Sequence, residues 1–148
     1  MSIQGKEMEL MMNSSKQMRA TEMGLTYAQL TITNLFNKTR VEIEALVDTG
    51  ATFMCITEEM ALQLGFDTTE VRQQLVTFAD GTQHWKPKVA PIEIGFDNRT
   101  YVTEAVVLGD EALMGVLPLE AMDLQVDPAN KRLIANPQHP NFPVASAK

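Results

Sequence analysis

Residues 45–52 read Ala-Leu-Val-Asp-Thr-Gly-Ala-Thr, so three apolar residues lead directly into a single acidic residue, Asp48. The preceding residues 41–44 alternate apolar and charged side chains, as in a strand with one exposed face. Asp48 therefore marks the point where a strand that becomes buried opens into a tight turn. A carboxylate in this place needs hydrogen bonds or a partner charge to offset its desolvation. Thr49 can provide a hydroxyl group, and Gly50 allows another backbone segment to come close.

The length and composition limit the classes of function that are open to the chain. Its 148 residues fit one domain, and its net charge of −7 with scattered basic residues predicts no nucleic-acid partner. The single cysteine excludes an internal disulfide and a cysteine-rich zinc site, and we expect no metal and no cofactor. No run approaches the roughly 18 apolar residues of a membrane span, and early acidic residues do not fit a secretion signal. We therefore expect a cytoplasmic protein with no membrane partner.

Three regions differ in composition along the chain. Residues 1–24 are rich in methionine and are interpreted as a leader that is either helical, with a docking face, or disordered. Residues 25–135 carry the strand-like patterns and form the predicted domain. Residues 136–148 contain three prolines and are interpreted as a C-terminal tail.

Alternation and turn residues predict a succession of hairpins in the central region. The first covers residues 25–48, and a short buried strand at 53–56 precedes a helix with Thr57 at its N-cap and Gly65 at its end. The next has strands at 71–78 and 83–89, and a third has strands at 89–96 and 100–108 around a turn at 97–99. A Leu-rich helix and two short strands complete the pattern up to residue 134. The second hairpin has its tip at Ala79, Asp80, Gly81 and Thr82, where Asp-Gly is a strong turn signal.

The octet around Asp48 resembles the active-site loop of the retropepsin-like aspartic proteases, whose signature is two hydrophobic residues, Asp, Thr or Ser, Gly and Ala. A second signature follows at Leu113, Met114 and Gly115, which resemble the second psi-loop of that family. Two signatures in the right order are much more specific than either alone. The run after Leu113 is more similar to the small bacterial single-domain members of clan AA than to the retroviral ones. The resemblance implies an all-β acid protease barrel with one or two short helices and one domain per chain.

The resemblance also implies a role for each matching residue. Asp48 would be the catalytic acid, supported in its loop by Thr49, Gly50 and Ala51. The hairpin tip at 79–82 would be the flap that closes over an extended peptide or unfolded protein substrate. Leu113, Met114 and Gly115 would form the second psi-loop behind the catalytic strand. The flap departs from the retroviral pattern in having only one glycine.

The number of Asp-Thr-Gly sequences in the chain bears directly on the mechanism. Aspartic protease chemistry uses two carboxylates that share a proton, one as general base for water and the other as general acid. This chain has a single Asp-Thr-Gly, at residues 48–50, so the second Asp48 must come from another copy. The sequence therefore predicts an endopeptidase that is active as a symmetric homodimer, at acidic pH.

Two other interpretations remain open from the sequence. The first is a protease-like module that binds peptides or dimerises with little or no catalysis. The second is an unrelated small β domain in which Asp48 is a turn residue with its hydrogen bonds satisfied. Cys55 is interpreted as a packed apolar group, and Trp85, the only tryptophan, either packs at the flap base or contacts substrate.

Overall fold

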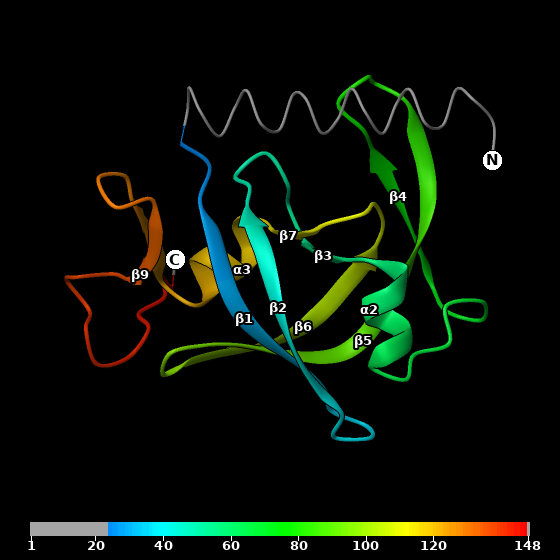
Figure 1. The fold of residues 1–148 in the computed structure, drawn as a ribbon, viewed down its shortest axis with the longest axis horizontal. Helices are drawn as coiled ribbons and strands as arrows, with labels where there is room; N and C mark the ends of the chain where they lie inside the picture. The colour runs from blue at the N-terminus through cyan, green and yellow to red at the C-terminus, as the bar shows by residue number, and fades with distance from the viewer. Residues whose placement is uncertain (1–23, 148) are drawn as a thin grey trace.

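The first described elements form the hairpin that the alternating sequence predicts. In the computed structural model, which describes residues 24–147, β1 (Tyr27–Asn34) pairs antiparallel with β2 (Arg40–Val47) (Figure 1). Alternate side chains of β1 are buried because every second side chain of a strand lies on the same face. β2 runs straight into Asp48. The methionine-rich leader predicted over residues 1–24 falls outside the described residues, apart from Gly24.

Seven further strands and two short helices, α2 (Glu58–Gln63) and α3 (Val116–Ala121), follow in the described chain. Helix α2 has the predicted boundaries, because the Met60 amide donates to Thr57 Oγ1 over 3.2 Å and Gly65 follows with a φ of +84°. Within residues 24–147, no helix is long and apolar enough to span a membrane. The elements after β2 are β3 (Met54–Ile56), α2 (Glu58–Gln63), β4 (Gln73–Thr77), β5 (Gln83–Phe96), β6 (Arg99–Val107), β7 (Ala112–Met114), α3 (Val116–Ala121), β8 (Leu124–Asp127) and β9 (Arg132–Ala135).

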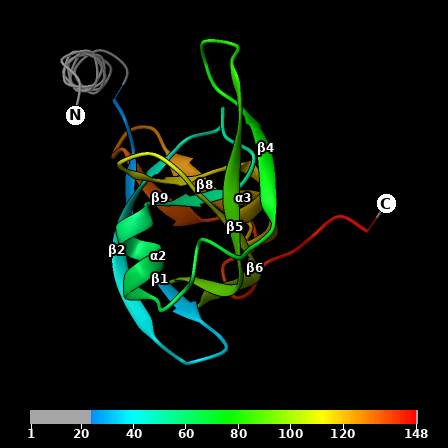
Figure 2. The ribbon, with the colours of Figure 1, turned by 90° about the vertical axis from the view of Figure 1, so that its right-hand side faces the viewer.

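Six of these strands close into a barrel. The strand order is β1-β2-β7-β3-β6-β5-β4, and an additional pairing of β1 with β5 joins the sheet to itself. β4 pairs only with the first part of β5, so this hairpin extends from the barrel wall (Figures 1 and 2). β8 and β9 form a separate two-stranded sheet. The predicted all-β barrel with one or two short helices is confirmed.

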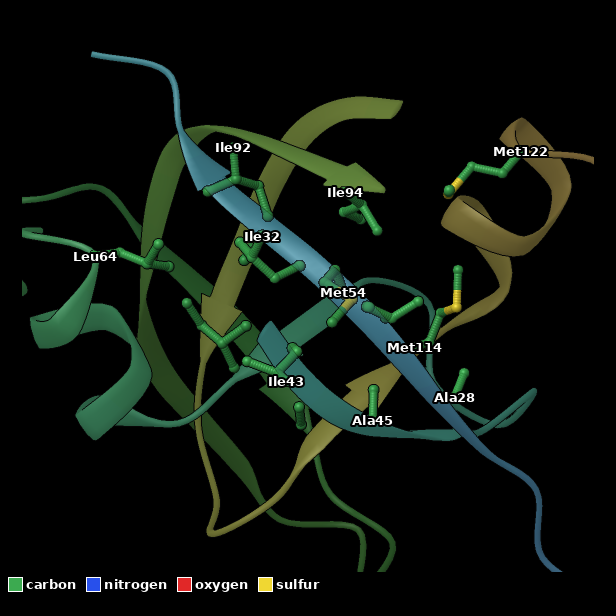
Figure 3. Packing of buried hydrophobic residues seen from close by; sticks show 14 of the residues in the cluster. Ala28, Ile32, Ile43, Ala45, Met54, Leu64, Ile92, Ile94, Met114 and Met122 are labelled. Atoms are coloured by element: carbon green, nitrogen blue, oxygen red, sulfur yellow. The ribbon is translucent and has the colours of Figure 1, made fainter. Parts of the chain in front are cut away.

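The barrel interior is filled by aliphatic and methionine side chains from nearly every strand. Figure 3 shows that these side chains meet between the strands and the two helices. Each large aliphatic side chain that is fully buried contributes about 1.5–3 kcal/mol through the hydrophobic effect. The labelled members of this core are Ala28, Ile32, Ile43, Ala45, Met54, Leu64, Ile92, Ile94, Met114 and Met122.

One long strand takes the place of two predicted ones. The sequence predicts separate strands at 83–89 and 89–96, but β5 continues through both, and its pairing with β6 shifts register between Val89 and Ile92. A cis peptide bond joins Ala90 and Pro91 at this shift. A proline cannot donate to a strand ladder, so the sequence pattern breaks there although the strand does not.

The prediction that Arg99 belongs to a turn is wrong. The turn contains Asp97 and Asn98, and Arg99 begins β6 with its side chain fully buried. Its guanidinium donates to the carbonyl oxygens of Met122, at 3.0 Å, and His139. A buried charge is tolerated when it is hydrogen-bonded in this way, so Arg99 ties the end of α3 and the C-terminal segment to the barrel.

Asp123 also holds this C-terminal segment. Its carboxylate accepts hydrogen bonds from the Asn136 side chain at 3.0 Å, the Val144 amide at 3.0 Å and His139 Nδ1 at 2.6 Å. These hydrogen bonds, the one from Asn136 foremost, lower the pKa of Asp123 to about 2. Residues 136–144 are therefore attached to the barrel through polar contacts.

We predict that replacing Arg99 with Met destabilises the fold by about 2–3 kcal/mol, since the buried carbonyl groups lose a charged donor. Urea unfolding measures the change. Arg132→Met is the matched control, because Arg132 is largely exposed and its ion pair with Asp127 is a surface contact at 3.6 Å. Equal midpoints for the two variants would show that the contacts of Arg99 carry no net stability.

Candidate active site

The Asp48 loop joins two strands that are separated by a third. β2 and β3 are connected by residues 48–53, yet β7 lies between them, parallel to β2 and antiparallel to β3. The chain leaving β7 must therefore pass close to this loop. Two hydrogen bonds hold the crossing, from the Val116 amide to the Ala51 carbonyl at 2.9 Å and from the Leu117 amide to the Thr52 carbonyl at 3.0 Å.

Gly115 lies at the tightest point of the crossing. A Cβ atom at this position would be 2.5 Å from the Phe53 carbonyl oxygen and 2.7 Å from that of Ala51. These neighbours are backbone atoms, which cannot rotate away as a side chain can. The site therefore requires glycine at position 115 for close approach of two backbones rather than for an unusual φ.

Asp48 is held by backbone groups on both sides. Its amide donates to the Met114 carbonyl at 3.0 Å, its carbonyl accepts from the Ala51 amide at 3.1 Å, and its Oδ1 accepts from the Gly50 amide at 2.9 Å. The Asp48 side chain is half-buried, and Thr49 and Gly50 are exposed. The carboxylate is thus oriented by its own loop and still reachable from outside.

Cys55, the single cysteine of the chain, lies in an environment that keeps its thiol protonated. Burial raises the pKa of the Cys55 thiol to about 11, and the negative charge of Asp48 adds to this effect. The Sγ atom lies 3.8 Å from the Phe53 carbonyl oxygen. A thiol in this state packs as a small apolar group, as the sequence predicts.

The predicted flap is the tip of the β4–β5 hairpin. Gly81 has a φ of +85°, and the Phe78 amide donates to the Thr82 carbonyl at 2.8 Å. Asp80 Oδ1 accepts from both the amide and the hydroxyl of Thr82, at 2.9 and 2.6 Å. These contacts lower the pKa of Asp80, the hydrogen bond from the Thr82 side chain contributing most. The tip is therefore braced by its own side chains.

The structure brings the two sequence signatures together, and the tip of the predicted flap lies at the same end of the molecule. Residues 48–51 and 113–115 contact each other directly through the crossing described above. Ala79, Asp80, Gly81 and Thr82 are exposed and belong to a different hairpin. Figures 1 and 2 both place the flap tip and the loop between β2 and β3 at the same end of the molecule.

One feature of the flap is not predicted from the sequence. His84 is exposed, and its ring stacks on Phe78 with a ring-centroid separation of 4.7 Å and lies 2.9 Å from Thr82 Oγ1. Lys86 Nζ lies 5.9 Å from the Phe78 ring centroid. Strand alternation could have grouped His84 and Lys86 on one face, since they are two residues apart.

Comparison with known proteins gives a consistent family assignment. The profile of the family described as "gag-polyprotein putative aspartyl protease" matches residues 32–121, more than half of the chain. No curated protein matches the chain. Among solved structures, a retropepsin-like aspartic protease from Rickettsia conorii is 24% identical, with a TM-score of 0.56 over 72% of this chain and 79% of that one. The EIAV protease, solved with the inhibitor HBY-793, is 19% identical, with a TM-score of 0.51 over 64% of this chain and 85% of that one.

We predict that Gly115→Ala destabilises the protein by about 1–3 kcal/mol, because the added methyl group meets backbone atoms that must be displaced. Thermal or urea unfolding measures the loss. Gly109→Asn is the control: Gly109 has a φ of +72° with open space where a Cβ atom would lie, and asparagine tolerates this conformation. Full stability of Gly115→Ala would contradict the close approach of the two loops.

We predict that Asp48→Asn shifts the reactivity of Cys55 to lower pH, by up to about one pH unit, because a negative charge that raises the thiol pKa is removed. The rate of iodoacetamide modification as a function of pH measures the shift, and the single cysteine makes the product unambiguous. Asp97→Asn, in an exposed turn, should leave the profile unchanged. Identical profiles for wild type and Asp48→Asn would show that Asp48 carries no charge near the thiol.

Proposed function

We propose that this chain, which belongs to the retropepsin-like aspartic protease family, is an endopeptidase. It would use two Asp48 carboxylates, one from each subunit of a homodimer. The observation that carries this proposal is the geometry of the single Asp-Thr-Gly loop. Its carboxylate accepts a hydrogen bond from the Gly50 amide, its loop is supported by the Gly115 crossing, and Asp48 remains half-exposed at one end of the barrel. A second copy is needed to complete the acid–base pair.

The two carboxylates would divide the chemistry of peptide hydrolysis. One ionised Asp48 accepts a proton from a water molecule as the water attacks the peptide carbonyl carbon, and the protonated Asp48 of the other subunit donates to the carbonyl oxygen. As the tetrahedral intermediate collapses and its C–N bond breaks, the leaving amine takes the proton that the first Asp48 removed from water, and the second Asp48 regains a proton from the hydroxyl group that becomes the carbonyl. Two carboxylates that share one proton titrate as a coupled pair, and the one-proton state is the active one.

The residues around Asp48 would keep this pair in register. Gly50 donates to Oδ1 and so restricts rotation of the carboxylate. Thr49 is exposed at the loop surface, where its hydroxyl group could bond across the two-fold axis to the partner loop. Ala51 is tied to the segment that follows β7 through the Val116 amide. Leu113, Met114 and Gly115 support the loop from behind.

The substrate would be an extended peptide or an unfolded protein segment. The flap tip at residues 79–82 lies at the same end of the barrel as Asp48, and a peptide between the two would bind as an added strand through backbone hydrogen bonds (Figure 1). Backbone recognition of this kind requires an extended chain, which folded proteins rarely offer outside their loops. The cytoplasmic location stays a prediction from the sequence.

We predict that wild-type protein cleaves a denatured protein at acidic pH, with a rate that rises faster than linearly with enzyme concentration, because only the dimer has both carboxylates. Asp48→Asn should reduce the rate by at least about a thousandfold, since general acid and base are lost together. Asp97→Asn, in an exposed turn, is the matched control and should keep full activity.

Sedimentation velocity at the same concentrations separates the possible failures of this proposal. A folded dimer that cleaves nothing at any pH from acidic to neutral would favour the non-catalytic binding module. Cleavage by a species that is monomeric at every concentration would contradict the shared pair of carboxylates.

A further inference from the structure

Helix α3 lacks the features that normally stabilise a short helix from within. Its six residues are well below the roughly 12 at which an isolated helix becomes even marginally stable in water. Its N-cap is Gly115, and within residues 24–147 no side-chain hydrogen bond caps it. Its first turn has no acidic residue and its last turn no basic one, whereas α2 has Thr57 as a cap and two glutamates in its first turn. The position of α3 must therefore be set by contacts with other segments.

Both ends of α3 are bonded to segments outside the helix. At its start, its first two amides donate to two carbonyl groups of the loop at residues 48–53, at 2.9 and 3.0 Å. At its end, Arg99 Nη1 donates to the Met122 carbonyl at 3.0 Å. The fully buried guanidinium thus places a positive charge at the carbonyl end of the helix, where the helix dipole is negative. α3 is a bridge, about 9 Å long, between the Asp48 loop and Arg99.

Asp123, which follows the helix, fastens the same end to the C-terminal segment. Its carboxylate accepts hydrogen bonds from Asn136, His139 and Val144. Its backbone is left-handed, with a φ of +54°, a conformation that aspartate and asparagine adopt more readily than most residues. The His139 carbonyl also accepts from Arg99, so the two anchors of the helix share a partner. We call Arg99, Asp123 and His139 the clasp.

The clasp keeps its negative charge in the acidic range in which the proposed enzyme would work. The pKa of Asp123 is lowered to about 2, by the hydrogen bond from Asn136 foremost, so its carboxylate stays ionised near pH 4, where an ordinary aspartate takes up a proton. A pKa that is lowered on folding stabilises the folded state above the unfolded pKa. That stabilisation is complete above about pH 5 and is lost as the pH falls toward 2.

We propose that Arg99 and Asp123 are positioning residues for the Asp48 loop, which hold the far end of α3 so that its first amides keep Asp48 aligned for reaction. The effect on catalysis rests on the proposed function, whereas the effect on the loop does not. Without the clasp, α3 can tilt about the Gly115 crossing, and its two hydrogen bonds to the loop lengthen. A displacement of about 1 Å at reacting groups can cost about a hundredfold in rate, so contacts that never touch substrate can limit turnover.

The first test follows the loop through Cys55 and needs no catalysis. Because the charge of Asp48 contributes to the raised pKa of the thiol, iodoacetamide reactivity as a function of pH reports whether Asp48 stays near it. We expect Asp123→Asn to move this profile to lower pH, by about a third or more of the shift that Asp48→Asn produces. In protein that already carries Asp48→Asn, the same replacement should add no shift, because no charge is left to move.

Asp127→Asn is the matched control, because it makes the same chemical change at the other end of β8. The Asp127 carboxylate accepts hydrogen bonds from the turn between β8 and β9 and pairs with Arg132 of β9. This variant should leave the Cys55 profile in place. His139→Ala is a second clasp variant, which should act in the same direction as Asp123→Asn and keeps the test decisive if the latter fails to fold.

The second test measures turnover of a peptide that wild type cleaves. We expect Asp123→Asn to lower kcat about tenfold and to leave KM within about twofold, since the alignment of the reacting groups changes and the peptide-binding surface does not. Asp127→Asn should keep both constants. Full turnover by Asp123→Asn, or a rise in KM alone, would overturn the proposal.

The two tests separate failure of this inference from failure of the proposed function. A Cys55 profile of Asp123→Asn that coincides with that of wild type would overturn the inference. An equally large shift in protein that carries Asp48→Asn would do the same, since a loosened core rather than the loop would then expose the thiol. A shift that depends on Asp48, together with no cleavage by wild type, would reject hydrolysis and keep the role of the clasp in placing the loop.

Discussion

The close approach of Gly115 to the backbone of residues 51–53 is the constraint on which the candidate site depends. β7 can lie between β2 and β3 only if the chain that leaves it passes directly by the loop joining those two strands. Any side chain at position 115 would separate the two segments and break the hydrogen bonds from Val116 and Leu117 to the loop. The backbone of the loop that carries Asp48 is therefore held by a segment far along the sequence, which explains why the two signatures occur together.

The same geometry leaves the site chemically incomplete in one chain. Asp48 can act as a base or as an acid, but a single carboxylate cannot do both in one step. The thiol of Cys55 is kept protonated by its burial and by the charge of Asp48 itself. Thr49 and Gly50 are exposed, so one chain alone presents an accessible acidic loop. In the proposed dimer a second loop would cover it. The second copy in the proposed function would supply the other carboxylate, and the exposed position of the loop is compatible with it.

Local patterns in the sequence predict local structure well, and they fail where distant segments meet. The alternation before Asp48, the Thr57 cap and the Asp80-Gly81 turn depend on neighbouring residues and are found as predicted. For Arg99 the sequence predicts a turn, because charged residues next to Asp-Asn are usually exposed. Its burial depends on carbonyl groups of Met122 and His139, which only the folded chain brings to it. The continuous strand β5 escapes prediction for a related reason, since a proline that breaks the pattern can still be accommodated where the register shifts.

The predicted flap is braced by contacts within its own hairpin. Its tip and one of its faces are held by side chains that contact one another, with Asp80 bound by Thr82 and His84 stacked on Phe78. These contacts lie within β4, β5 and the turn between them, so they do not depend on the packing of the barrel. Backbone hydrogen bonds from such a flap would be similar for every extended peptide and would give affinity without selectivity. Any selectivity of the proposed enzyme would then have to come from contacts with the side chains of the peptide rather than with its backbone.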